Sequence, residues 1–156
     1  MRPTPDRVRE TLFNWLGQDL FGKRCLDLFA GSGALGMEAA SRGATEVVMV
    51  EKSRAVYGVL KENIGRLGFG NITLRCEDGL NFARRDKEKF DVIFLDPPFQ
   101  SDYLVKLLPL MEDLLTQDGM LYIESGTQFE AGEFWQVCKH SKAGAVHYQL
   151  LQHKTT

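Results

Sequence analysis

The chain has 156 residues, a length that favours one domain able to bury a core of its own. Apolar residues make up 44% and charged residues 26%, which excludes a chain disordered by composition. The apolar runs are only of strand length, and charged residues occupy the first ten positions, where a secretory signal would be apolar. We therefore expect a cytoplasmic protein without a membrane-spanning segment.

Charge is unevenly distributed along the chain. The net charge of −2 argues against a sequence-independent nucleic-acid binder, which is usually basic. However, Arg2, Arg7 and Arg9 crowd the first ten residues, and no acidic residue follows Glu133. Basic ends around an acidic middle are a weak indication of a polyanionic partner.

The three cysteines, Cys25, Cys76 and Cys138, form no C-x-x-C pair and have no histidine beside them. We expect no metal site and no cysteine nucleophile. Cys25 and Cys76 fall within predicted strands, so both are expected to be buried thiols.

The first predicted element is a helix from residue 5 to residue 16. Thr4 is placed as its N-cap and Pro5 as its first helical residue, apolar residues follow at helical spacing, and Gly17 is expected to end it. Strands and helices then alternate, which predicts right-handed βαβ units and a parallel sheet. The strands are placed at 25–29, 47–50, 72–76, 91–95 and 120–124, and the helices at 34–43, 54–67, 80–85 and 103–115.

The last two predicted strands differ from the rest. Residues 134–138 and 146–152 are extended runs separated by Lys142-Ala143-Gly144, which predicts a hairpin rather than a crossover. The expected fold is therefore α/β, a mostly parallel sheet ending in an antiparallel hairpin. One domain covers 1–156, with the helix at 5–16, the sheet core at 24–126 and the hairpin at 134–152.

A glycine-rich turn follows the first predicted strand. Gly31-Ser32-Gly33-Ala34-Leu35-Gly36 has G-x-G-x-x-G spacing, and glycine lets a ligand approach the backbone closely. Glu51, twenty residues after Gly31, is placed to accept the two hydroxyl groups of a ribose. The two features fit NAD, FAD and S-adenosylmethionine alike, and a turn that only packs a helix on a strand is the alternative.

Two carboxylates favour S-adenosylmethionine over the dinucleotides. Asp27 lies within the first strand, where it can meet the ammonium group of this cofactor, and a dinucleotide has no such cation. Asp78 follows the third strand and is placed to accept the amino group of adenine. Asp78 also fits the N-cap of the helix that begins near Leu80, and the two roles can coexist.

The tetrapeptide Asp96-Pro97-Pro98-Phe99 directly follows a buried strand, at the sheet edge where ligands bind in open α/β folds. Two prolines remove two donors, so an acceptor-only surface remains: the Asp96 carboxylate and the Pro97 carbonyl. An aromatic amine attacks poorly because its lone pair is delocalised, and two acceptors on its N–H bonds can pull it toward tetrahedral geometry. Phe99 offers a face for stacking a base, and the methyl transfer needs positioning and electrostatics but no metal.

Three segments together resemble the RsmD family of small-subunit ribosomal RNA guanine-N2 methyltransferases: Arg2–Thr4 with Asp6–Asn14, then Asp27–Gly36, then Asp96–Phe99. The resemblance covers nearly the whole chain, and the first segment is the most specific. It implies a seven-stranded class I methyltransferase fold, small-subunit ribosomal RNA as the partner within a ribosomal particle, and catalysis at Asp96, Pro97, Pro98 and Phe99. It also implies S-adenosylmethionine bound by Asp27, Ala30, Gly31, Ser32, Gly33, Glu51, Lys52, Asp78, Gly79 and Asp96.

One departure from the family concerns the start of the chain. Relatives usually carry a segment rich in glycine and arginine before the Arg-Pro-Thr motif, and Met1 stands in its place here. If that segment is missing, we expect cofactor binding to survive and the affinity for RNA to be in question.

Three rival functions remain open on the residues alone. A DNA adenine-N6 or cytosine-N4 methyltransferase uses the same tetrapeptide, but such enzymes add a recognition segment for which 156 residues leave no room. An NAD-dependent oxidoreductase needs a general acid at the strand ends, and no His, Tyr or Lys is placed there. A non-catalytic RNA-binding module leaves the nucleoside and acceptor motifs unexplained.

Overall fold

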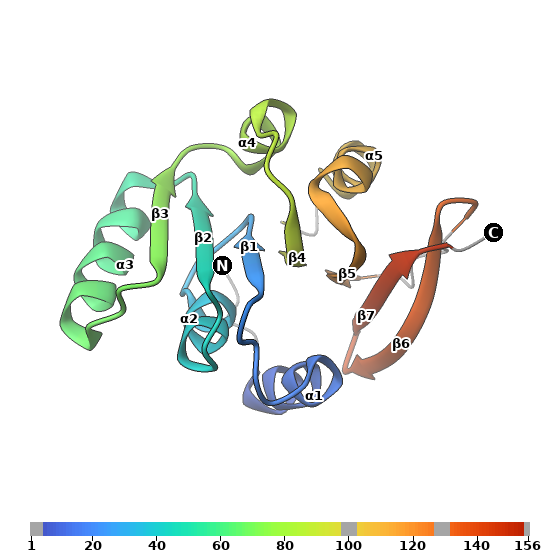
Figure 1. Cartoon of the computed structure of the whole chain (residues 1–156), viewed down its shortest axis with the longest axis horizontal. Coiled ribbons are helices and arrows are strands. Elements are labelled where there is room, and N and C mark those ends of the chain that lie inside the picture. The colour runs from blue at the N-terminus through green and yellow to red at the C-terminus, as the bar shows by residue number, and fades with distance from the viewer. Residues whose placement is uncertain (1–4, 98–102, 127–131, 155–156) are drawn as a thin grey trace.

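A single seven-stranded sheet runs through the computed structural model, which describes residues 5–97, 103–126 and 132–154 (Figure 1). The strand order is β3-β2-β1-β4-β5-β7-β6. The strands are β1 (Arg24–Asp27), β2 (Glu46–Glu51), β3 (Ile72–Cys76), β4 (Phe90–Leu95), β5 (Leu115–Ser125), β6 (Trp135–Ala143) and β7 (Val146–His153). The first five pair in parallel, and β7 is antiparallel to both β5 and β6. The predicted α/β fold with a closing hairpin is confirmed.

Helices cover both faces of the sheet and make three layers. They are α1 (Asp6–Leu16), α2 (Ala34–Ser41), α3 (Arg54–Leu67), α4 (Gly79–Arg85) and α5 (Tyr103–Leu114). In Figure 1, α4 and α5 lie above the sheet, and α1 and α2 lie below it. Because side chains alternate along a strand, each central strand contributes to both faces: Leu26 packs with α4 and α5, and Cys25 packs with α1 and α2.

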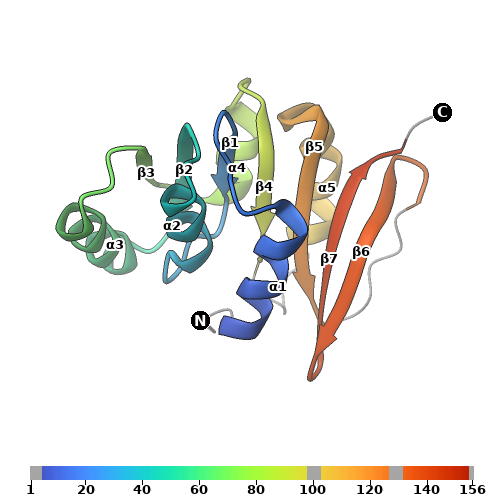
Figure 2. The same ribbon diagram turned by 60° about the horizontal axis from the view of Figure 1, so that its bottom comes forward.

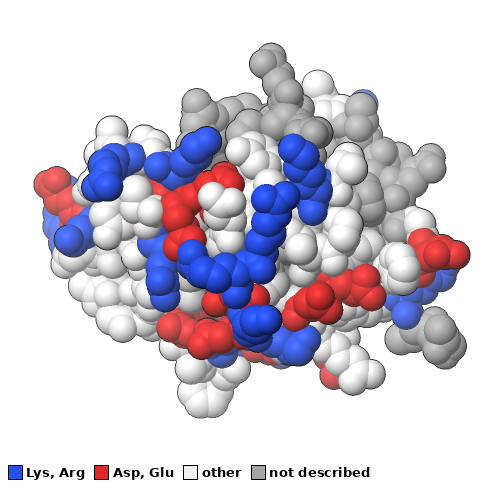
Figure 3. All heavy atoms as spheres, turned by 90° about the horizontal axis from the view of Figure 1, so that it is seen from above, with Lys and Arg blue, Asp and Glu red and all other residues white. Residues whose placement is uncertain are grey.

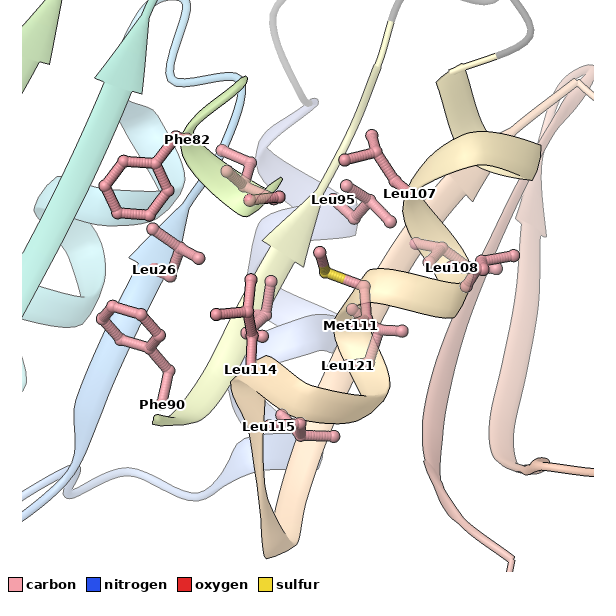
Figure 4. Packing of buried hydrophobic residues seen from close by; sticks show 14 of the residues in the cluster. Leu26, Phe82, Phe90, Leu95, Leu107, Leu108, Met111, Leu114, Leu115 and Leu121 are labelled. Atoms are coloured by element: carbon pink, nitrogen blue, oxygen red, sulfur yellow. The ribbon is translucent and has the colours of Figure 1, made fainter. Parts of the chain in front are cut away.

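The core under α4 and α5 is built from apolar side chains of the helices and the sheet. Leu107, Met111 and Leu114 of α5 point toward Leu26 and Leu95 of the sheet in Figure 4, and all five are at most 2% exposed. Burial of each such side chain stabilises the fold by about 1.5–3 kcal/mol. This layer therefore holds the carboxyl ends of β1 and β4 in fixed positions.

Most predicted elements agree with the structure, and the differences lie at their ends. The helix predicted from residue 5 begins at Asp6, and Pro5 precedes it in an extended conformation rather than as its first residue. Gly17, with a φ of 103°, ends that helix as expected. The predicted strand 25–29 is Arg24–Asp27, because the chain already turns at Leu28. Strand β5 begins at Leu115 rather than at 120, since Leu115 pairs with Phe90 before an irregularity in the register.

The closing hairpin is longer than predicted. Its first strand continues through Ala143, so the loop is Gly144-Ala145 rather than Lys142-Ala143-Gly144. Gly144 has a φ of 61°, and a two-residue loop with glycine in its first position suits the twist of two antiparallel strands. From this turn the two strands keep one register as far as the pair Lys139 and Leu150.

The prediction that Cys76 is buried is wrong. Cys25 is fully buried in the central strand β1, where desolvation raises the pKa of its thiol to about 12. Cys76 is exposed, because β3 is the first strand of the sheet and only its inner edge is paired. Strand order, rather than strand character, decides this difference.

The helices within residues 5–97, 103–126 and 132–154 include no candidate for a membrane-spanning helix. None of them combines the length and the apolar character that a bilayer crossing requires.

Candidate active site

Four carboxylates stand at the carboxyl ends of four neighbouring strands. Asp27 ends β1, Glu51 ends β2, Asp96 follows β4 and Glu124 lies near the end of β5. By strand alternation they share the face covered by α1, together with Phe94 and other residues of that core. Asp27, Glu51 and Glu124 are at most 5% exposed. This carboxylate row makes the edge strongly attractive to a cation.

Asp27 is held under the start of α2. Burial raises the pKa of its carboxyl to about 7, and the charges of Glu51 and Glu124 add to the increase. Hydrogen bonds from the backbone N–H groups of Gly36 and Phe29 act in the opposite direction. A Cβ at Gly36 would lie 2.9 Å from the Met49 side chain and 3.3 Å from Asp27 Oδ2, so glycine lets α2 come this close.

Glu51 fixes the glycine turn with both of its oxygens. Its Oε1 accepts the N–H of Gly31 at 2.9 Å, and its Oε2 accepts the N–H of Ser53 at 2.8 Å. A carboxylate oxygen can accept more than one hydrogen bond, so each keeps capacity for a ligand hydroxyl. The structural role of Glu51 and its predicted role toward a ribose are therefore compatible.

The glycine turn itself adopts conformations that favour glycine. Gly31 and Gly33 have φ values of 56° and 81°, in the left-handed region that side chains disfavour. Ala30 donates to the carbonyl of Val50 at 2.9 Å, and Gly33 donates to that of Ala30 at 2.7 Å. Ser32 is exposed at the tip of the turn. The turn thus lies directly beside the carboxylate row, with Gly31 and Gly33 buried and Ser32 exposed.

Asp78 caps α4 and also receives a hydrogen bond that the sequence did not reveal. Its side chain accepts the N–H of Asn81 at 3.3 Å, as expected for an N-cap. Its other oxygen accepts the hydroxyl of Tyr103, the first residue of α5, also at 3.3 Å. The ring of Tyr103 lies 5.6 Å from that of Phe29, which follows β1. Three segments far apart in the sequence therefore meet at Asp78.

Gly79 lets the segments beside Asp78 approach one another. A Cβ at this position would lie 2.7 Å from the carbonyl oxygen of Leu28 and 3.1 Å from the Phe29 ring. Two residues before Gly79, the N–H of Glu77 donates to the carbonyl of Glu51 at 3.1 Å. This contact places the predicted base-binding carboxylate next to the predicted ribose-binding one. Lys52, the other residue predicted here, is exposed.

The structure describes the first two residues of the tetrapeptide Asp96–Phe99. Asp96 is half-buried and Pro97 is buried, whereas Pro98 and Phe99 lie outside the described residues. Tyr122 donates its hydroxyl to Glu124 at 2.7 Å, and burial raises the pKa of Tyr122, with the charges of Glu124 and Asp96 adding to the increase. The Asp96 carboxylate therefore lies near Tyr122 and Glu124.

The sequence did not single out Tyr103, Tyr122 or Glu124. The latter two lie on a strand with ordinary alternation, and Tyr103 opens a helix without a motif. No local signal could have found them, since their partners come from strand order and helix placement.

The strand order, the glycine turn with its acidic partner, and the acceptors after β4 define a class I methyltransferase. A ribosomal protein L11 methylase from Lactobacillus delbrueckii subsp. bulgaricus shares this fold at a TM-score of 0.78, with 18% identity, 99% of this chain and 81% of that chain covered. The family model described as "Conserved hypothetical protein 95" matches residues 1–152. The chain belongs to this family, the RsmD family of methyltransferases.

Relatives within the family are similar over most of their length. The chain is 39% identical to "Ribosomal RNA small subunit methyltransferase D" of Escherichia coli K12, over 97% of this chain and 79% of the relative. The protein of the same name from Haemophilus influenzae is 36% identical, over 97% and 83%. The solved structure of yhhF from Escherichia coli has a TM-score of 0.91 at 38% identity, covering all of this chain and 89% of that one.

Proposed function

We propose that this chain methylates small-subunit ribosomal RNA, and that the acceptor is the exocyclic N2 amine of a guanine. The observation that carries the proposal is the position of Asp96 and Pro97, which directly follow β4 beside the carboxylates of β1 and β5. The names of the relatives support ribosomal RNA as the substrate class. Guanine N2 rests on the family resemblance of the motifs.

The donor cofactor that fits this edge is S-adenosylmethionine, which supplies an electrophilic methyl group on a sulfonium. Its sulfonium and ammonium groups are cations, and they suit the carboxylate row of Asp27, Glu51, Asp96 and Glu124. The pyrophosphate of NAD or FAD is anionic and would be repelled there. Among the chain's residues, Glu51 would hold the ribose, Asp78 the adenine amine and the turn at Ala30–Gly33 the remaining backbone contacts.

The residues after β4 prepare the acceptor. The Asp96 carboxylate and the Pro97 carbonyl would each accept one N–H of the target amine, which aims its lone pair along the line of transfer. As the new C–N bond forms and the C–S bond breaks, positive charge develops on the nitrogen. The fixed negative charge of Asp96 stabilises that charge without having to reorganise.

The target amine must be accessible to the methyl group, and this limits how the RNA can bind. A base edge that is paired and stacked cannot be attacked in line, so the guanine must turn out of its stack at a cost of a few kcal/mol. A net acidic chain of this size carries little surface for reading a sequence. We therefore expect it to recognise the shape of folded RNA within a ribosomal particle, with binding that weakens as salt rises.

The test is transfer of tritium from labelled cofactor to naked ribosomal RNA, small-subunit particles and duplex DNA, followed by nucleoside analysis. We expect label on N2-methylguanine, with the particle as the best substrate. Label on adenine or cytosine of DNA would replace this proposal with a DNA amino-methyltransferase. Label on another base of the RNA would support an RNA methyltransferase but replace guanine N2 as the methylated group.

A further inference from the structure

The turn of the β6–β7 hairpin projects next to the candidate active site. Strand β7 runs antiparallel to β5, and His147, near its start, pairs with Ser125, which directly follows Glu124. The Gly144-Ala145 turn must then continue past the carboxyl ends of the parallel strands. Figure 2 shows this turn reaching beyond the ends of β4 and β5.

Two histidines and a lysine share one face of the hairpin near this turn. His140 Nε2 lies 3.0 Å from His147 Nδ1, and the two rings are 12° from parallel. Lys142 pairs directly with His147 in the strand register, so strand alternation puts its side chain on the same face. We call His140, Lys142 and His147 the hairpin patch.

No acidic residue follows Glu133 within residues 132–154, so no acidic side chain of the hairpin itself balances the hairpin patch. Three arginines, by contrast, are paired with acidic side chains: Arg24 with Glu46 and Glu88, Arg42 with Glu38, and Arg85 with Glu77. Over the face that carries α4 and α5, basic and acidic side chains lie side by side (Figure 3). Paired charges attract a polyanion weakly, whereas the ammonium group of Lys142 has no acidic partner on the hairpin.

The groups of the hairpin patch suit phosphate oxygens. Lys142 is an exposed ammonium, and His140 is exposed beside it. In a hydrogen-bonded imidazole pair, a ring nitrogen outside the pair can donate an N–H without carrying a charge. Gly144 and Ala145 at the turn are small, so a polymer backbone can approach closely. The turn offers no large exposed apolar side chain of the kind that anchors protein partners.

We propose that the hairpin patch binds the phosphate backbone of the RNA acceptor next to the methylated nucleotide. This inference rests on the proposed function, since it assumes an RNA acceptor at Asp96. Lys142 supplies charge, and the histidine pair supplies one neutral N–H donor. By strand alternation the three side chains lie on the side of the sheet that carries Leu151, opposite Glu124 and Asp96, so the RNA would cross the sheet edge beside Ser125 to reach Asp96.

The experiment measures binding of small-subunit ribosomal RNA and of the ribosomal particle to the full chain, without turnover, at several salt concentrations. Lys142→Ala should weaken binding about fivefold near 0.15 M salt and lower the salt slope by about one, as expected for one lost phosphate contact. Replacing both histidines by alanine should weaken binding roughly threefold without changing the slope, because neutral donors release no counterions.

Lys61→Ala is the matched control, an exposed lysine on α3, at the opposite edge of the sheet. It should bind RNA as the unaltered chain does, and all variants should keep the affinity for S-adenosylhomocysteine. Unchanged RNA binding and slope in Lys142→Ala would overturn the inference, even if guanine is methylated. Label on DNA bases alone would instead overturn the proposed function, whatever the hairpin variants do.

Discussion

The edge of the sheet formed by the carboxyl ends of its parallel strands differs in burial and in charge between its two sides. Beside β1 and β2, the carboxylates of Asp27 and Glu51 are buried, and backbone N–H groups hold them before any ligand arrives. Beside β5 and β7, the hairpin patch is solvent-accessible and carries the opposite charge. Buried charge interacts strongly and resists screening by salt, whereas exposed charge acts over distance and weakens in salt.

Such a contrast would let one small chain bind two ligands of opposite charge. Buried carboxylates can select a compact cationic cofactor, because its positive charge stabilises carboxylates that have little contact with water. A large polyanion is attracted by groups that stay in water and lose few hydrogen bonds on binding. Asp96 lies between the two regions, so its substitution should have the largest effect.

Replacing Asp96 with alanine should slow single-turnover methyl transfer on the order of 10²–10³-fold, because a fixed stabilising charge beside the amine is lost. The affinity for S-adenosylhomocysteine should stay within a few-fold, since the cofactor is held mainly by the β1 and β2 side. Rapid-quench transfer and calorimetry measure the two quantities. A near-normal transfer rate in this variant would remove Asp96 from the acceptor site.

Replacing Glu51 with alanine should weaken binding of S-adenosylhomocysteine by roughly 2–3 kcal/mol, through loss of two hydroxyl contacts. The change also leaves the N–H groups of Gly31 and Ser53 without their acceptor, so the glycine turn loosens. Calorimetry of the variant against NAD and S-adenosylhomocysteine checks both ligand classes. Tighter binding of NAD than of S-adenosylhomocysteine by the unaltered chain would exclude the cofactor assignment.

The affinity for S-adenosylmethionine should rise with pH by up to about tenfold per unit below 7 and level off above it. The cause is Asp27, whose pKa of about 7 must fall when a cation binds beside it, so binding releases a proton at lower pH. Asp27→Asn should flatten this dependence. The same raised pKa predicts that Asp27 contributes stability when protonated, fully below pH 4, and that this contribution is lost as pH rises toward 7.

Removing the hydroxyl of Tyr103 tests the base end of the cofactor site, with the smallest expected effect. Tyr103 orients Asp78 through the 3.3 Å hydrogen bond, so Tyr103→Phe should reduce the preference for S-adenosylhomocysteine over its inosine analogue about fivefold. The analogue has a carbonyl in place of the adenine amine, so it probes Asp78 directly. Tyr57→Phe, on α3, is the control. An undiminished preference in Tyr103→Phe would make that hydrogen bond purely structural.

The parts of the site that could be predicted are those encoded within short segments. Gly31, Gly33 and Gly36 were found because a turn that opens a helix after a strand imposes a local spacing. Gly17 and the Asp78 N-cap were predictable for the same reason. Local chemistry determines such features, so they can be read without knowing the fold.

The remaining parts depend on which strands and helices become neighbours. The Tyr103–Asp78 bond joins residues 25 positions apart, and the exposure of Cys76 follows from the place of β3 at the sheet edge. The sharing of one face by Asp96 and Glu124 requires β4 and β5 to be adjacent. The hydrophobic pattern of the sequence predicts each strand but not which strands are neighbours in the sheet. These contacts therefore become visible only in the structure.

The irregular register of β6 has a consequence for how copies of the chain behave toward one another. This last strand of the sheet is shifted between Val137 and Lys139, and Lys139 and Lys142 are exposed along it. An open strand edge invites another sheet to extend it, which leads to aggregation. Here the shift breaks the row of free backbone groups, and a second copy approaching antiparallel would bring lysines toward lysines. Both features oppose extension of the sheet by a second copy at this strand.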